Sequence, residues 1–90
     1  GKASQMLLQF YQGLIVPNTA IAEEDNQIGV YVKDLSGDYH FTRIKVITTD
    51  GNYSLVNSAH FYETNSESEQ IKIKTVEIYD EILRNAGLEE

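Results

Sequence analysis

The sequence predicts an all-β protein, and three observations lead to this fold class. Apolar and polar residues alternate with a period of two along several short segments, turn residues separate those segments, and Val, Ile, Tyr, Phe and Thr are frequent within them. The chain has 90 residues, which is enough for one hydrophobic core. We therefore predict a single domain over residues 1–90, a small antiparallel, partly open β-barrel or sandwich of about six to eight short strands.

The amino-terminal part of the chain predicts two strands. Met6–Tyr11 and Leu14–Val16 are largely apolar, and Gly13 separates them. Pro17 ends the second segment at a position that needs no hydrogen-bond donor in the sheet.

The clearest local signal is a hairpin over residues 28–47. Apolar residues alternate with other residues over 28–33 and again over 40–47, and Asp34–Asp38 between them includes Gly37. A period of two on both sides of a turn that contains glycine is typical of two antiparallel strands.

Three further strands are expected downstream. A turn at Asp50-Gly51 leads into a short strand, Tyr53–Val56. Ala59–Glu63 and Gln70–Val76 resemble another hairpin pair, closed by the polar residues 64–69.

Residues 76–87 leave two alternatives open. Their apolar positions have helical spacing, and Gly87 is placed like a helix stop. A strand would need only Glu81–Arg84, which is too short for periodicity to decide between the two structures. The residues with helical spacing are Val76, Tyr79, Ile82, Leu83 and Ala86.

The alternation also predicts which side chains form the core. They are the apolar residues that one face of each strand would bury. The predicted core residues are Ile15, Ile21, Val30, Val32, Ile44, Val46, Leu55, Ile73 and Ile82.

Composition excludes several classes of function. Seven basic residues stand against 14 acidic ones, a net charge of -7, so the surface repels phosphate backbones and anionic lipids. We therefore predict no nucleic-acid partner. The absence of cysteine excludes disulfides, thiolate metal sites and a cysteine nucleophile.

No group of residues has the spacing of a metal or catalytic site. His60 and Glu63 would project from opposite faces of a strand, so they would not share a metal ion. Asp34-x-Ser36-x-Asp38 resembles the start of a calcium loop, but Tyr39 and Lys45 occupy the positions where that loop needs glycine and a bidentate acid. The chain also has no nucleophile-elbow serine motif and no phosphate-binding loop. We predict no enzymatic activity, no metal and no cofactor.

One long stretch resembles a known family. Gly13 to Asp25, followed by Gly-Val-Tyr-Val at 29–32, is similar to the G-L-x-V-P-x-x-A-I-x-E-x-D…G-V-Y-V signature of HlyD-like membrane fusion proteins. These are adaptor subunits of bacterial efflux and secretion systems, and the signature belongs to their C-terminal, membrane-proximal β-domain. The version found in Gram-positive bacteria is the most similar. The residues that carry the match are Gly13, Val16, Pro17, Ala20, Ile21, Glu24, Gly29, Val30, Tyr31 and Val32.

The resemblance extends over residues 12–90. Asp50 and Gly51 match the family's D-G-x-Y-x-x-V segment, and Tyr79 and Asp80 match the start of a late strand. The second match favours a strand over a helix at 81–84. Residues 87–90 match the linker toward a last return strand.

The resemblance implies a non-enzymatic domain that docks on an integral-membrane transporter, together with other copies of the adaptor. Such a domain works at the outer face of the cytoplasmic membrane, and only its parent protein's anchor associates it with the membrane. The chain lacks the lipoyl-like and coiled-coil segments that precede this domain in the family, so we expect a fragment excised from a longer adaptor. The alternative is a stand-alone acidic extracytoplasmic β-module that binds peptide or carbohydrate through exposed tyrosines.

Overall fold

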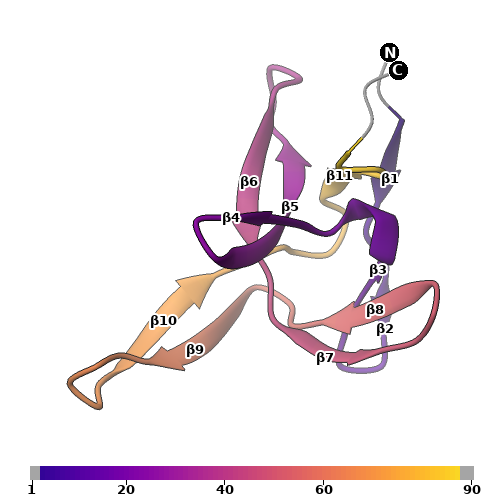
Figure 1. Ribbon diagram of the computed structural model, residues 1–90. Coiled ribbons are helices and arrows are strands. Elements are labelled where there is room, and N and C mark those ends of the chain that lie inside the picture. Colours follow the sequence, from indigo (N-terminus) through magenta and orange to yellow (C-terminus); the bar gives the residue numbers. More distant parts are fainter. Residues whose placement is uncertain (1–2, 88–90) are drawn as a thin grey trace.

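The computed structural model describes residues 3–87, and its strands form three antiparallel sheets (Figure 1). The predicted all-β fold class is confirmed. Eleven strands lie within the described residues, more than the predicted number, because several are only two or three residues long. No sheet in this part of the chain closes into a barrel, so the arrangement is that of a small open sandwich.

A five-stranded sheet is built around β5. On one side β5 pairs with β6 from Gly29 to Lys33, and its other side is shared by β4 and β11. β1 pairs with the outer edge of β11, so the first and last strands of the domain are neighbours. The strands are β1 (Ser4–Met6), β4 (Ala22–Glu24), β5 (Gln27–Lys33), β6 (Tyr39–Arg43) and β11 (Glu81–Leu83).

A four-stranded sheet packs against the first one. Its order is β2-β3-β8-β7, and the pairing of β7 with β8 is irregular between Val46 and Thr48. The strands are β2 (Gln9–Phe10), β3 (Gly13–Pro17), β7 (Val46–Thr49) and β8 (Tyr53–Val56). A short 3-10 helix, η1 (Asn18–Ala20), connects β3 to β4.

The third sheet is a hairpin of β9 (His60–Thr64) and β10 (Gln70–Lys74), which projects from the rest of the domain (Figure 1). This projection accounts for the elongated shape, with extents of 44 × 26 × 24 Å. The hairpin is attached at its base. There Phe61 is buried, the Arg43 guanidinium lies 5.5 Å from the centre of its ring, and the buried Thr75 hydroxyl donates to the Arg43 carbonyl.

The core lies between the two larger sheets and draws on both of them. The cluster of buried residues is Leu7, Leu14, Val16, Ala20, Val30, Ile44, Val56, Val76 and Ile82, with Ile21, Val32 and Val46 packed against it. Six of the predicted core residues are therefore in or against the core. Ile15, Leu55 and Ile73 are only half-buried, so their prediction as core residues was wrong.

Two of those errors share one cause. The sequences of β3 and β8 are Gly-Leu-Ile-Val-Pro and Tyr-Ser-Leu-Val. Because apolar residues follow one another in both strands, alternation does not show which of these side chains face the core. Leu14 and Val56 are fully buried, opposite each other in the register, while Ile15 and Leu55 form the next pair and face outward. Ile73 lies on the projecting hairpin, away from the main core.

The predicted strand 40–47 is interrupted. β6 ends at Arg43 and β7 begins at Val46, because the chain crosses from one sheet to the other between them. Ile44 stays buried at the crossing, and its N–H donates to the Ile28 carbonyl at 3.1 Å.

The carboxy-terminal segment is a strand where it is regular. β11 covers Glu81–Leu83, so the helical alternative for residues 76–87 was wrong. The linker match at 87–90 falls mostly on residues 88–90, which lie outside the described residues.

Candidate functional site

The family-signature residues form structure rather than a converging site. Val16 on β3, Ala20 in η1 and Val30 on β5 are fully buried in one cluster, and Ile21 and Val32 pack against it. These side chains hold the two larger sheets together.

Two signature glycines are required because backbones approach closely. A Cβ added at Gly13 on β3 would lie 2.5 Å from the Val56 carbonyl oxygen. A Cβ at Gly29 on β5 would lie 2.4 Å from the Thr42 carbonyl oxygen and 2.7 Å from the Phe41 ring. Neither position has room for a side chain.

Other signature residues fix local geometry. Pro17 ends β3 in an extended conformation, with φ -65°, immediately before η1. The Tyr31 hydroxyl on β5 donates to the Glu24 carboxylate at the end of β4, which ties the two strands together on the surface. This hydrogen bond, with partial burial and the Glu24 charge, raises the pKa of Tyr31.

Asp50 and Gly51 form the turn between β7 and β8. The Asp50 carboxylate accepts from the N–H groups of Tyr53, at 2.8 Å, and Asn52, at 2.7 Å, and these bonds lower the pKa of Asp50. Gly51 is exposed, and a Cβ there would meet nothing within 4 Å.

Tyr79 and Asp80 lie directly before β11, where they bond to the chain between β1 and β2. The Tyr79 N–H donates to the Leu7 carbonyl at 2.8 Å, and the Leu7 N–H donates to the Asp80 carbonyl at 2.7 Å. Tyr79 has a left-handed backbone, with φ 73°, and an exposed side chain. The signature residues are thus spread over both large sheets and act as a scaffold.

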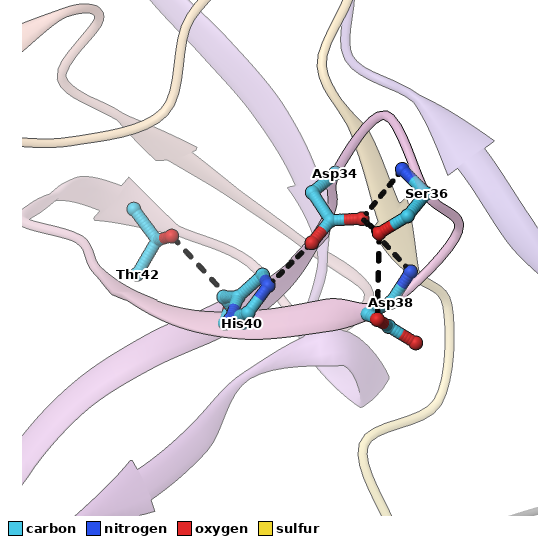
Figure 2. Close-up of polar contacts among 5 residues, drawn as sticks. All are labelled: Asp34, Ser36, Asp38, His40 and Thr42. Atoms are coloured by element: carbon cyan, nitrogen blue, oxygen red, sulfur yellow. Dashed lines mark hydrogen bonds and ion pairs between the residues drawn. The ribbon is translucent and has the colours of Figure 1, made fainter.

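The scaffold presents two hairpin tips whose geometry the sequence did not reveal. In the β5–β6 tip, Asp34 Oδ1 accepts from Ser36 N–H at 2.9 Å, Asp38 N–H at 3.0 Å and the Ser36 hydroxyl at 2.8 Å (Figure 2). Asp34 Oδ2 lies 2.6 Å from Nε2 of His40 on the following strand. The bonds from Ser36 and then His40, together with the backbone donors, hold the pKa of Asp34 well below its usual range.

The main chain closes the same tip. Asp34 N–H donates to the Asp38 carbonyl at 2.7 Å, and Gly37 N–H donates to the Asp34 carbonyl at 3.1 Å. Gly37 is left-handed, with φ 92°.

The β9–β10 tip repeats this pattern at Asn65. Asn65 Oδ1 accepts from the N–H groups of Glu67 and Glu69, both at 2.9 Å. Asn65 N–H donates to the Glu69 carbonyl at 2.9 Å, Ser68 N–H donates to the Asn65 carbonyl at 3.1 Å, and Ser68 is left-handed. Each tip is therefore a five-residue turn held by its first residue, over 34–38 and 65–69.

The two tips share a sequence signal that could have been found. Each begins with Asp or Asn, has Gly or Ser three residues later, and ends with an acid. Asp and Asn readily bond the backbone two residues on, and the fourth position needs a positive φ. The tips present exposed side chains, foremost Leu35, which is fully exposed in the first tip.

The Asp34 cluster is not a catalytic triad. The Ser36 hydroxyl donates to Asp34 and lies 3.4 Å from the Asp38 carboxylate, so no contact to His40 activates it (Figure 2). In a triad, the histidine accepts the proton of the nucleophile. The carboxylate here orders a turn.

Other candidate chemistry does not converge either. Within residues 3–87, no three His, Asp or Glu side chains are arranged to hold a metal ion. Glu63, which the sequence spaces for a metal site with His60, instead forms an ion pair with Arg43. The hydrogen bond from Arg43 is the main cause that lowers the pKa of Glu63, and the positive charges of Arg43 and Lys45 lower it further.

The exposed tyrosines do not form one surface. Tyr11 lies in the β2–β3 turn, Tyr53 starts β8, Tyr62 is on β9 and Tyr79 precedes β11. Tyr62 is on the projecting hairpin, away from the other three elements (Figure 1).

The part of the chain that the structure describes has no helix with the length and hydropathy needed to cross a membrane. Comparison with protein-family models, with curated proteins and with solved structures found no match to this chain.

Proposed function

We propose that this chain is a non-enzymatic docking domain, the membrane-proximal β-domain of an HlyD-like adaptor. It binds an integral-membrane transporter at the outer face of the cytoplasmic membrane, alongside other copies of the adaptor. The observation that supports the proposal best is the pair of hairpin tips, which project from a packed scaffold and are each held by the same pattern of hydrogen bonds.

Ordered tips suit a docking role. A loop that is already fixed in the free protein loses less conformational entropy when it binds. Both tips are acidic, with Asp34 and Asp38 in the first and Glu67 and Glu69 in the second. An acidic tip favours a partner with basic loops and speeds encounter at low ionic strength.

The arrangement of the ends also supports the proposal. β1 and β11 are paired, so the described chain enters and leaves the domain at one place. The β9–β10 tip is at the far end of the molecule from this pair (Figure 1). A domain joined to a longer adaptor at the β1–β11 end can present the β9–β10 tip to a partner.

Photo-crosslinking in cells tests the proposal. A photoreactive amino acid is placed at Leu35 or at Ser66 in the intact protein, and a matched control is placed at Asn26, an exposed residue of the β4–β5 turn. We expect the two tip positions to capture an integral-membrane transporter and the control to capture none. Adducts with soluble proteins only, or none at any tip position, would contradict the proposal.

A further inference from the structure

The amino-terminal part of the domain differs from the rest in charge. Residues 3–22 contain no Asp, Glu, Lys or Arg, although 23% of the chain is charged. The same segment holds exposed apolar side chains: Met6 is 49% exposed, Leu8 59% and Phe10 51%. An uncharged apolar strip on an acidic domain is typical of a surface that another molecule covers.

This strip lies along two open sheet edges. β1 is the end strand of the five-stranded sheet, and β2 is the end strand of the four-stranded sheet. Only Leu7 and Leu8 separate them, so residues 4–10 belong first to one sheet and then to the next, with an open edge on opposite sides of the chain.

Alternate backbone groups of this edge point outward. On β1, the Ala3 carbonyl accepts from Arg84 N–H at 3.1 Å, and Leu7 N–H donates to the Asp80 carbonyl. In an antiparallel pair, inward and outward residues alternate, so Ser4 and Met6 direct their N–H and C=O groups away from β11.

β2 is open on the other side of the chain. The Leu8 carbonyl accepts from Ile15 N–H at 3.3 Å, so Leu8 directs its backbone groups toward β3. The next residue, Gln9, therefore directs its N–H and C=O groups away from β3. Gln9 thus faces the opposite side of the chain from Ser4 and Met6. Among the described residues, the groups that lie together and are free to bind an added strand are those of Ser4 and Met6, on the edge of β1.

An apolar groove runs beside the edge. It has a volume of about 300 Å³ and is lined by Gln5, Met6, Leu8, Gln9, Phe10 and Ile15. An added strand would direct every second side chain toward this groove. Apolar side chains would fit the groove, and the glutamines at its border could contact polar ones.

Other edges carry features that discourage pairing. β4 has Glu23 and Glu24, β10 has Lys72 and Lys74, and the uncharged edge β7 is irregular in its pairing. Charges and irregularities of this kind protect exposed edges from other strands. β1 and β2 have neither.

We infer that the β1 edge binds an extended segment of a partner protein by strand addition. The segment has apolar residues at alternate positions and basic residues at its ends, because the groove is uncharged and the surrounding domain has a net charge of -7. The same charge opposes pairing with a second copy of the chain or contact with an anionic bilayer. The inference rests on the proposed function in one respect, that the partner is a protein. It adds a second contact with that partner, besides the contact at the hairpin tips.

A synthetic peptide of alternating leucine and threonine, about seven residues long with lysines at both ends, is the probe. We expect it to bind the purified domain and to slow exchange of the amide protons of Ser4 and Met6. The control is the same peptide with its edge-facing nitrogens methylated, which keeps the side chains but removes the donors. We expect the control to bind at least about tenfold more weakly.

Two lysine variants locate the binding site. Met6→Lys adds a charge to the β1 edge, and Ile47→Lys adds the same charge to β7, where Ile47 is 51% exposed. We expect Met6→Lys to weaken binding about tenfold and Ile47→Lys to change it less than about twofold. Circular dichroism of both variants confirms that they fold. If Met6→Lys does not fold, the methylated peptide gives the result alone.

Four outcomes would overturn the inference. They are equal binding of the methylated peptide, protection that appears at β7 instead, concentration-dependent self-association through residues 4–9, and binding of the edge to neutral lipid vesicles but not to the peptide. Crosslinking from Leu35 and Ser66 is independent of this edge. If tip crosslinks form but the edge binds no peptide, the proposed function stands and only the inference fails.

Discussion

Asp34 and Asn65 hold two hairpin tips through the same backbone bonds, but only Asp34 can be titrated. Its carboxylate accepts from Ser36, from His40 and from backbone N–H groups, so its pKa is lowered in the folded protein. The pKa of an aspartate side chain in an unfolded chain is about 3.9. A lowered folded pKa means that the stabilisation is complete above about pH 4 and is lost as the pH falls further.

We therefore expect the β5–β6 tip to loosen below about pH 4, while the β9–β10 tip does not. NMR protection of the Ser36 and Asp38 amides as a function of pH measures this. The matched variant is Asp34→Asn, which keeps the acceptor as Asn65 does and should remove the acid-induced loss. The same acid-induced loss in Asp34→Asn would show that another group is responsible.

Gly29 gives a second test at the scale of one residue. A Cβ there would overlap the Thr42 carbonyl and the Phe41 ring, so β5 and β6 would have to separate. We expect Gly29→Ala to lower the free energy of unfolding by about 1–3 kcal/mol. Gly51→Ala is the control, because its added methyl meets nothing within 4 Å, and it should be neutral or slightly stabilising. Urea denaturation that ranks the two variants equally would contradict the close approach of the strands.

At the scale of elements, a few side chains attach the β9–β10 hairpin. Phe61 is 3% exposed, and the Arg43 guanidinium lies over its ring while pairing with Glu63. The Arg43 Nε–H is buried and has no hydrogen-bond partner among residues 3–87, so the ring and the carboxylate are what offset its desolvation.

Removal of that ring should release the hairpin. We expect Phe61→Ala to destabilise the domain by about 3–5 kcal/mol and to lower the amide protection of β9 and β10 before that of the two larger sheets. Tyr62→Ala is the control on the same strand, because Tyr62 is 47% exposed, and it should change stability by less than about 1 kcal/mol. Equal losses in both variants would contradict the attachment through Phe61.

The elements also show what the sequence could predict. The β5–β6 and β9–β10 hairpins follow from their alternation and their turns, and both are confirmed. The inward face of β3 was not predictable, because Leu14, Ile15 and Val16 are all apolar and only the packing of the opposite sheet selects among them. The break after Arg43 was also hidden, since alternation continues through a crossing between sheets.

The tips illustrate a different limit. Their residue types were recognisable as turns, but the equivalence of Asp34 and Asn65 depends on five-residue geometry that no single propensity describes. The open edge at β1 depends on strand order, which the local pattern of residues 4–10 does not contain.

At the scale of the whole molecule, shape and charge divide the surface. The radius of gyration is 13.1 Å, compared with about 12 Å for a compact chain of this length, and the projecting hairpin explains the difference. Acidic residues occupy both tips, while residues 3–22 are uncharged. One molecule thus offers two acidic projections and one apolar edge.

The central claim is that the two tips are ordered before any partner arrives. Backbone ¹⁵N NMR relaxation of the free domain measures this at residues 34–38 and 65–69. The hydrogen bonds of Asp34 and Asn65 predict order parameters of about 0.85 at both tips, as in the strands. Values below about 0.6 at either tip would contradict the claim, because a mobile loop would have to become ordered on binding.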